Sequence, residues 1–336
     1  MYESFYKLTV KPFQLNPDPN FYFGSRGHKR AMSYLEYGLH QGEGFIVITG
    51  EVGAGKTTLV RNLFLKLERD NVVGAQLVST QLDADEILRL VCASFGLAHE
   101  EVSKAVLLKK LEGFLLACHK QGKRALLVVD EAQNLTQRAV EELRMLSNFQ
   151  IGEKSLMQSF LLGQPEFRQT LQGEGMQQLR QRVIASYHLG PMDAPDTRAY
   201  IEHRLHTAGW QGDPSFSDAA HAAIYDYTGG IPRRINTVCD RLMLMGYLEE
   251  KHAFDAAEVS EVIADLQREF TTTEASANGA AKPMAENGAG AAHSNVQLNR
   301  LDERVSQMEK SLVSVLNLSR EILAFARTRG IRKERR

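Results

Sequence analysis

The sequence predicts a three-layer α/β/α domain built on a parallel sheet, followed by an all-helical domain and a C-terminal coiled-coil helix. Up to about residue 190, short apolar runs alternate with helical patterns, which is typical of a parallel sheet covered by helices on both faces. From Ala194 onward the strand patterns stop and helical spacings remain. We therefore expect the sheet domain at 43–190 and the helical domain at 191–270.

The composition is that of an ordinary soluble globular protein. Of the 336 residues, 43 % are hydrophobic and 24 % are charged, which excludes collagen-like and wholly disordered chains. The net charge of −1 excludes a globally basic nucleic-acid binder. No apolar run approaches the roughly 20 residues that cross a bilayer, and the N-terminus lacks the pattern of a secretory signal. We expect a cytoplasmic protein without a transmembrane segment, which reaches the inner membrane only through partners.

Each element of the two domains is predicted from local periodicity. The run at 125–129 is continuously apolar, as a strand covered on both faces must be. The expected strands lie at 45–49, 72–78, 125–129 and 160–162, with one more after residue 182. The expected helices lie at 59–67, 87–95, 106–118, 138–148, 199–206, 218–227, 234–246 and 256–270.

Composition separates the two ends of the chain from these domains. Residues 1–42 form an aromatic and proline-rich N-terminal segment. Residues 271–294 are small and polar, which predicts a flexible linker. Between 295 and 326, apolar residues recur in steps of three and four, as in a short coiled coil; an amphipathic helix that packs back on the globular part is the alternative. The tail at 327–336 is basic and is expected to be solvated. The three cysteines (Cys92, Cys118 and Cys239) are expected to be buried thiols.

A glycine-rich loop follows the first predicted strand. The residues from Gly50 to Thr57 match the pattern G-x-x-x-x-G-K-[ST], with a strand before them and a helix after them. In such a loop the backbone N–H groups and the helix N-terminus bind phosphate oxygens. Lys56 is expected to reach the β- and γ-phosphates of ATP, and Thr57 to ligate Mg²⁺. The predicted binding residues are Gly50, Glu51, Val52, Gly53, Ala54, Gly55, Lys56, Thr57 and Thr58.

Two acidic residues close the apolar run at 125–129. Ligands of open α/β sheets bind at the carboxyl ends of the strands, where Asp130 and Glu131 are expected to lie. Asp130 is predicted to hold Mg²⁺, and Glu131 to orient and polarise the water that attacks the γ-phosphate. The alternative for Glu131 is a cap on the following helix.

These motifs resemble those of the AAA+ ATPases. Besides the loop at Lys56 and the acids at 130 and 131, the helical domain carries the turn Gly-Gly-Ile-Pro-Arg that ends at Arg233. Within that class the chain is similar to the ExeA/GspA-type secretion ATPases, and most similar to the ATPases of exosortase (PEP-CTERM) and exopolysaccharide loci. The resemblance extends to about residue 270 and rests on the segments at 2–6, 11–13, 17–19, 130–133 and 162–166.

The resemblance implies further residue roles. Gln164 matches the first sensor, which contacts the γ-phosphate or the attacking water; a satisfied core amide is the alternative. Arg182 matches the arginine finger, which completes the site of a neighbouring subunit, with Arg180 as its rival. Arg233 matches the second sensor, with Arg234 as its rival. The N-terminal segment lines the adenine pocket in the family, although simple aromatic packing explains its composition equally well.

The resulting expectation is an ATP hydrolase that requires Mg²⁺ and works as a homo-oligomeric ring or filament, with its finger acting in trans. By resemblance, its partner is a protein of an envelope export machine, of the secretion or exopolysaccharide type. The alternative is a DNA-binding AAA+ regulator that resembles the transposition ATPases. For that alternative, the basic residues at 28–30, 109–110 and 327–336 are the candidate contacts, although solvated helix faces explain them equally well. A P-loop kinase is disfavoured by the helical domain, and nucleic acid is not the favoured partner.

Overall fold

The computed structural model describes residues 1–278, apart from 17, 68–70, 79–82 and 101. The chain divides into two compact units, Met1–Thr272 and Thr273–Arg336. The described part of the second unit is the end of a helix. The predicted coiled coil at 295–326 and the basic tail at 327–336 lie outside the described residues.

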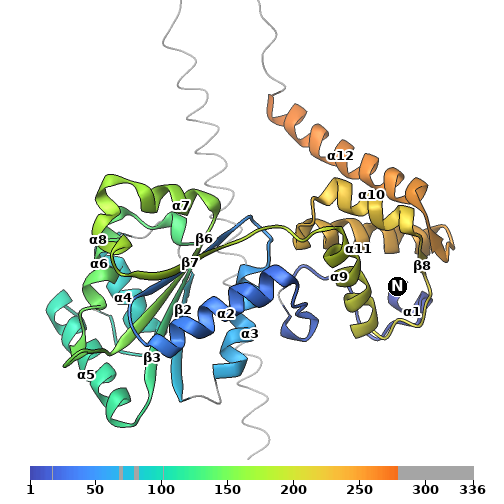
Figure 1. The fold of residues 1–336 in the computed structure, drawn as a ribbon. Coiled ribbons are helices and arrows are strands. Elements are labelled where there is room, and N and C mark those ends of the chain that lie inside the picture. The colour runs from blue at the N-terminus through green and yellow to red at the C-terminus, as the bar shows by residue number, and fades with distance from the viewer. Residues whose placement is uncertain (17, 68–70, 79–82, 101, 279–336) are drawn as a thin grey trace, which may run out of the picture. The chain divides into compact units, whose positions relative to one another are not determined.

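Five parallel strands form the central sheet of the first unit (Figure 1). Their order across the sheet is β2-β3-β6-β1-β7, so β1 lies between two strands that follow it late in the sequence. All five strand predictions correspond to strands of this sheet. Their bounds are Phe45–Gly50 (β1), Val72–Val78 (β2), Arg124–Asp130 (β3), Met157–Gly163 (β6) and Val183–Leu189 (β7).

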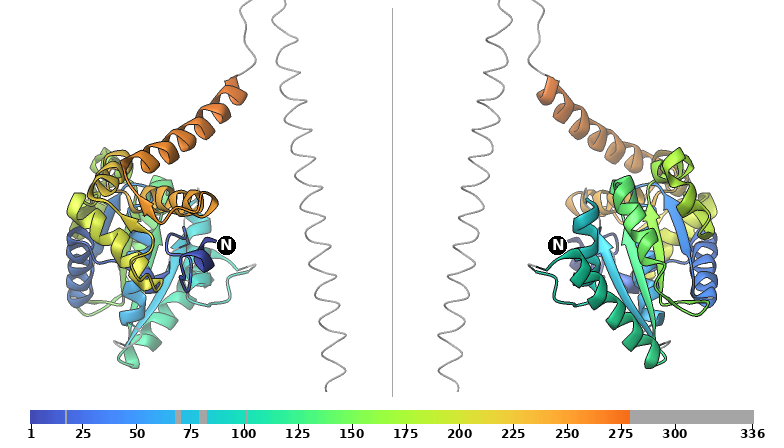
Figure 2. Two further views of the ribbon diagram at one scale, coloured as in Figure 1. Left: turned by 90° about the vertical axis from the view of Figure 1, so that its right-hand side faces the viewer. Right: turned by 90° about the vertical axis from the view of Figure 1, so that its left-hand side faces the viewer.

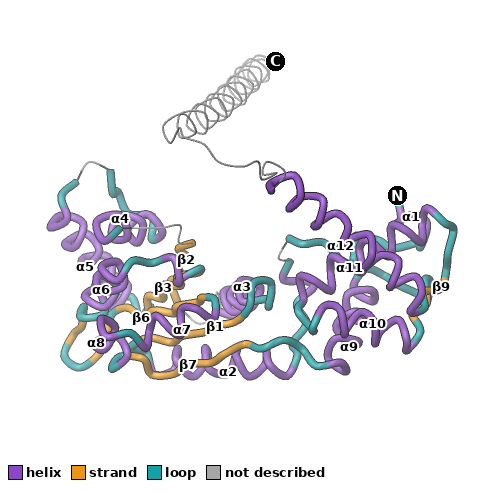
Figure 3. Tube along the Cα trace, turned by 90° about the horizontal axis from the view of Figure 1, so that it is seen from above, coloured by secondary structure: helices purple, strands orange, loops and turns teal. Residues whose placement is uncertain are grey.

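Alternation along the strands divides the apolar side chains between two cores. In β1, Ile46 and Ile48 pack with α2 and α3, whereas Phe45 and Val47 pack in the core under α4 to α8. Viewed from above, the strands lie between α2 and the group of α4, α5 and α6 (Figure 3). The helices of the first face are Arg26–Gln41 (α2) and Lys56–Leu67 (α3). The helices of the second face are Ala84–Ser94 (α4), Lys104–Lys120 (α5), Gln137–Leu146 (α6), Pro165–Gln172 (α7) and Gln177–Arg180 (α8).

The domain after β7 is helical with one small exception. Its helices are Ala194–Thr207 (α9), Asp218–Thr228 (α10), Pro232–Leu248 (α11) and Ala256–Asn278 (α12). The prediction that this domain is all-helical needs correction, because β8 (Ser215–Phe216) pairs in parallel with β9 (Ala253–Phe254). Two-residue strands carry too little periodicity to be visible in a sequence. Helix α12 also continues past residue 271 to Asn278, into the region predicted as a linker, since extending a helix costs far less than starting one.

The N-terminal segment is divided between the two domains. Helix α2 covers the sheet, but the residues before it pack in the core of the helical domain. Buried Phe13 and Phe21 belong to that core, together with α1 (Tyr2–Phe5). The hydroxyl of Tyr2 donates to Asp240 of α11 at 2.5 Å. Figure 2 shows this segment, in dark blue, among the yellow and orange helices of the helical domain. The residues before α2 are therefore structurally a part of the helical domain, whereas α2 belongs to the sheet domain.

The three cysteines are free and buried, as their apolar surroundings predict. Burial raises the pKa of the thiols of Cys92 and Cys118, which keeps them protonated at neutral pH. Cys92 and Cys239 belong to the apolar cores on α4 and α11, and Cys118 is a buried residue of α5.

Candidate active site

The glycine-rich loop connects β1 to α3 and holds Lys56 at the first position of that helix. The ammonium group of Lys56 donates to the carbonyl oxygens of Gly50 at 2.7 Å and Glu51 at 3.0 Å. Only 6 % of Lys56 is exposed, and this burial lowers the pKa of its amine, although the nearby carboxylates of Glu131 and Asp130 oppose the shift. The amine is therefore held over the loop by the backbone that would surround a phosphate.

Asp130 ends β3 and lies within hydrogen-bond distance of the helix that follows the loop. The hydroxyl of Thr57 donates to its carboxylate at 2.8 Å, and the side chain of Asp130 is almost completely buried. Protein sites for Mg²⁺ use hard oxygen ligands, one or two of them carboxylates, and the substrate phosphates supply much of the remaining shell. The hydroxyl of Thr57 and the carboxylate of Asp130 fit this donor set.

The carboxylate of Glu131 is held by two amides. Its Oε2 atom accepts hydrogen bonds from Nε2 of Gln133 at 2.6 Å and from Nε2 of Gln164 at 3.2 Å. The backbone N–H of Gln164 in turn donates to Oε1 of Gln133 at 3.0 Å, which closes the cluster. Glu131 has a φ of 54°, a left-handed conformation that is unfavourable for a residue with a side chain. Strain of this kind, maintained by specific hydrogen bonds, is typical of a residue whose side chain must point in one direction.

The helical domain approaches the loop at the start of α11. The backbone N–H of Arg233 donates to the carbonyl oxygen of Gly53 at 3.2 Å. Gly53 has a φ of +81°, and a Cβ atom at this position would clash with Cβ of Arg233, so a glycine is needed here for two reasons. Both Arg233 and Arg234 are exposed, but only Arg233 lines the pocket above the loop.

A pocket of about 330 Å³ lies where the loop, the N-terminal segment and the helical domain meet. Its size falls in the range of small-molecule sites. Most of the predicted loop residues line it, together with Glu131 and Arg233. Residues without a site role predicted from the sequence also line the pocket or contact Glu131: Gln14, Leu15, Asn16, Gln133, Tyr200, Arg204, Pro232 and Asn236.

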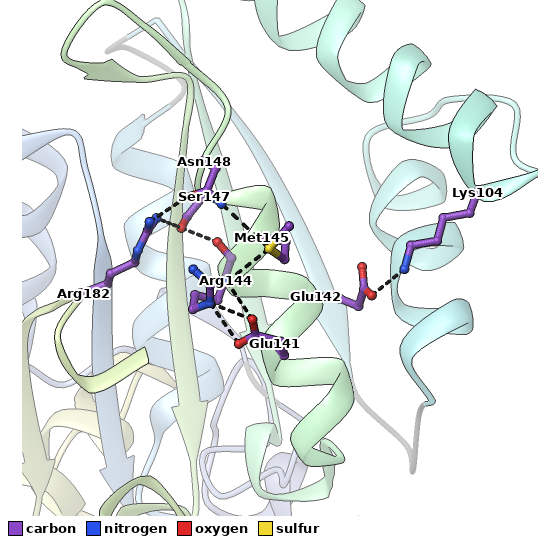
Figure 4. A network of polar contacts seen from close by, with 8 residues as sticks. All are labelled: Lys104, Glu141, Glu142, Arg144, Met145, Ser147, Asn148 and Arg182. Atoms are coloured by element: carbon purple, nitrogen blue, oxygen red, sulfur yellow. Dashed lines mark hydrogen bonds and ion pairs between the residues drawn. The ribbon is translucent and has the colours of Figure 1, made fainter. Parts of the chain in front are cut away.

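Arg182 lies at the amino ends of the strands, whereas the glycine-rich loop of its own chain lies at their carboxyl ends. Its carbonyl oxygen accepts from the N–H of Phe45, the first residue of β1, whereas the loop follows the last residue of β1. Its guanidinium group donates to Oγ of Ser147 and to Oδ1 of Asn148, both at 2.6 Å, beyond the end of α6 (Figure 4). Arg180 instead donates to the carbonyl oxygens of Leu171 and Gly173. Neither arginine lines the pocket of its own chain.

The sequence predictions thus fall into two groups. The loop, the acids at 130 and 131, Gln164 and Arg233 come together around one pocket or its edge. Arg182 does not join them within one chain. Gln133 had a detectable signal, because a polar residue two positions after Glu131 is close enough in the chain to contact the acids, but the direction of its side chain cannot be derived from spacing.

Comparisons with known proteins agree with this geometry. Residues 39–171 match the family model of the AAA domain. The chain is 37 % identical over 261 residues to general secretion pathway protein A of Aeromonas hydrophila, which covers 77 % of this chain and 47 % of that protein. The chain therefore spans about half the length of this relative.

Solved structures show the same fold at low identity. The ORC2 protein of Aeropyrum pernix has a TM-score of 0.57 at 16 % identity, covering 76 % of this chain and 71 % of that chain. The Cdc6p protein of Pyrobaculum aerophilum has a TM-score of 0.56 at 14 % identity, covering 73 % and 68 % of the two chains.

Among the described residues, no helix is long and apolar enough to cross a bilayer.

The parallel sheet, the glycine-rich loop and the acids at the end of β3 define a P-loop ATPase of the AAA+ class. The helical domain and the 37 % identity to general secretion pathway protein A indicate which type of AAA+ ATPase it is. The chain belongs to the AAA+ ATPases of the ExeA/GspA type.

Proposed function

We propose that this ATPase uses Mg²⁺ and ATP in the pocket between its sheet and its helical domain to drive or regulate assembly of an envelope export system. The observation that supports the chemistry is the cluster of Glu131, Gln133 and Gln164 beside the glycine-rich loop. A carboxylate held in one orientation at the edge of a phosphate site is suited to remove a proton from an attacking water.

Each side chain has a distinct role in the proposed hydrolysis. Lys56 binds the β- and γ-phosphates. Its ammonium group then donates to phosphate oxygens in place of the carbonyl oxygens of Gly50 and Glu51. Thr57 and Asp130 hold Mg²⁺, which neutralises charge on the phosphates when it is bound. Glu131 accepts the proton of the water. Gln164 acts as the first sensor of the γ-phosphate.

Arg233 completes the site from the helical domain. Its backbone already contacts Gly53 of the loop, and its side chain lines the pocket, which supports a role as the second sensor. The rival position, Arg234, is not part of the pocket lining. Hydrolysis would change the contacts of Arg233 and shift the helical domain, as in other nucleotide switches.

We also propose a ring or filament in which Arg182 acts on the neighbouring subunit. This proposal is supported by the position of Arg182 at the amino ends of the strands, away from the loop of its own chain at their carboxyl ends. An interface of this head-to-tail kind closes into a ring only if its rotation permits. A finger in trans makes hydrolysis dependent on assembly.

The proposed process rests on the relative named general secretion pathway protein A. We propose that the partner is a protein of a secretion, exopolysaccharide or exosortase-type export machine, which the ATPase meets at the inner membrane from the cytoplasm. The likeness to the ORC2 and Cdc6p proteins is one of fold alone, at 16 % and 14 % identity, and it gives no reason to prefer DNA as the partner.

Two experiments test these proposals. The purified chain should hydrolyse ATP only with Mg²⁺, and turnover per subunit should rise with protein concentration as the oligomer forms. A steep, salt-sensitive stimulation by duplex DNA would instead favour the DNA-bound regulator. In the native host, replacing the chain by its Glu131→Gln variant should block export of polysaccharide or secreted protein, with Lys66→Ala as the control; normal export would overturn the proposed process.

A further inference from the structure

Arg204 is a buried cation on α9 at the wall of the pocket. Only 6 % of it is exposed, and it lines the pocket together with Tyr200 of the same helix. Within the described part of the chain, no carboxylate pairs with its guanidinium group. Burial of a charge without an opposite charge is unfavourable unless its hydrogen-bonding groups are fully used, so this arginine needs a structural or functional reason.

The guanidinium group of Arg204 is used to hold the N-terminal segment. Its Nε atom donates to the carbonyl oxygen of Pro12 at 2.5 Å, and Nη2 donates to the carbonyl oxygen of Gln14 at 3.3 Å. Nη1 donates to the hydroxyl of Tyr200 at 3.0 Å. The group also lies over the ring of Phe21, 4.8 Å from its centroid. The planar guanidinium group can donate to two carbonyl groups at once in a fixed geometry, whereas the ammonium group of a lysine cannot.

The residues that Arg204 holds continue directly into the pocket. Gln14, Leu15 and Asn16, which we call the N-terminal wall, line it beside α9 and α11. Leu15 is 56 % exposed, so its side chain is accessible from the pocket that it lines. A second contact fixes the same wall, since Nδ2 of Asn236 donates to the carbonyl oxygen of Gln14 at 3.4 Å. The wall is thus fixed through its backbone and offers one apolar and two amide side chains to the pocket.

We infer that Arg204 is a positioning residue that fixes the N-terminal wall against the base of the bound nucleotide, and thereby sets the preference of the site among nucleoside triphosphates. This inference rests on the proposed nucleotide site. Because the loop at Lys56 binds the phosphates, the base lies against the remaining lining of the pocket. A planar base has an apolar face and a polar edge, for which the pocket lining offers the apolar side chain of Leu15 and the amide side chains of Gln14 and Asn16.

The test compares nucleotide affinity and selectivity in two variants. Arg204→Lys keeps the charge but loses the paired donation to Pro12 and Gln14, so the Kd for ATP should rise about tenfold and the KM should rise more than kcat falls. The ratio of GTP affinity to ATP affinity should move toward one. Arg198→Lys is the matched control, because Arg198 lies on the same helix but is exposed and pairs with Glu202 and Asp218. It should keep the wild-type ratio.

Hydrogen exchange provides a second measurement. The amides of residues 14–16 should exchange faster in Arg204→Lys, whereas those of α3 should not change. If Arg204→Lys does not fold, Asn236→Leu, which removes the other side-chain hydrogen bond to Gln14, should shift the ATP-to-GTP ratio in the same direction. A folded variant at either position with wild-type ATP affinity and selectivity would overturn the inference. If the wild-type chain bound no nucleotide, the proposed function itself would fail.

Discussion

The hydroxyl of Thr57 donates a hydrogen bond of 2.8 Å to the carboxylate of Asp130. Thr57 belongs to the first turn of α3, which follows β1, and Asp130 is the last residue of β3. In the sheet, β6 lies between β1 and β3, so the loop must reach across the end of β6 for this contact to form. The contact brings the phosphate-binding loop and the acidic end of β3 into one site, on which every role proposed here depends.

Replacement of Lys56 tests the proposal that the glycine-rich loop binds the phosphates of ATP. Lys56→Ala removes the ammonium that lies over the loop, and the loss of charge-assisted hydrogen bonds should weaken ATP binding about tenfold to a hundredfold. Turnover should be abolished. The measurements are equilibrium binding of ATP and steady-state phosphate release. Lys66→Ala is the control, because Lys66 lies at the other end of α3 in an exposed pair with Glu36. Normal turnover of Lys56→Ala would remove the assignment.

Glu131→Gln separates binding from hydrolysis. An amide cannot accept the proton of the attacking water, so kcat should fall by about 10²- to 10⁴-fold while ATP still binds. The variant should therefore accumulate in the ATP-bound assembled state, which sedimentation with ATP measures. Hydrolysis at the wild-type rate would show that Glu131 is not the base.

The amide cluster has a smaller, separable effect. Gln133→Leu removes the 2.6 Å hydrogen bond that orients Glu131, and we expect kcat to fall about tenfold with little change in the Kd for ATP. Gln164→Ala removes the longer bond of 3.2 Å and also the proposed sensor, so it should lower kcat further. If neither variant altered kcat, the cluster would have a purely structural role.

Arg182 is tested by mixing subunits. Arg182→Ala should lose turnover, and it also loses its hydrogen bonds to Ser147 and Asn148, so a drop in stability alone does not identify a finger. When Arg182→Ala subunits are mixed with Lys56→Ala subunits, some interfaces combine an intact loop with an intact arginine, and activity should return. Rescue that occurs only with Arg180→Ala in place of Arg182→Ala would assign the finger to Arg180.

The sheet was readable from the sequence because its signals are local. The strand at 72–78 has the predicted bounds, and the strands at 45–49 and 125–129 differ only at their ends. Buried parallel strands are continuous apolar runs, and the glycine-rich loop and the acids at 130 and 131 each come at the end of such a run. Helix α2 also carried a signal, since its buried Ala31, Leu35 and Leu39 have helical spacing, but the aromatic residues before it dominated the prediction for 1–42.

The contacts that join distant segments were not readable in this way. Arg204 holds the carbonyl oxygen of Pro12, nearly two hundred residues earlier in the chain, and no periodicity encodes that pairing. The direction of Gln133 likewise depends on the left-handed backbone at Glu131. Side chains that act through a single tertiary contact leave no pattern in a sequence, so only the structure identifies them.

His28 gives the site a predictable sensitivity to acid. Its ring lies under the loop, with Nε2 3.0 Å from the carbonyl oxygen of Ala54 and Nδ1 2.7 Å from Oγ of Ser25. Burial lowers the pKa of this imidazole, although the hydrogen bond to Ala54 and the charge of Asp196 oppose the shift. The unfolded chain therefore takes up a proton near the ordinary histidine pKa of about 6.5, whereas the folded chain takes it up only at lower pH.

The free energy of unfolding should consequently fall as the pH drops below about 6.5, and part of that fall should disappear in His28→Gln. Gln was chosen because its amide can still donate to the carbonyl oxygen of Ala54. Urea unfolding at a series of pH values measures the difference between the two curves. Burial also lowers the pKa of His203 and His221, so the wild-type slope alone does not isolate His28. His40→Gln, at the exposed end of the same helix, should run parallel to the wild type, and a His28→Gln curve that does the same would contradict the assignment.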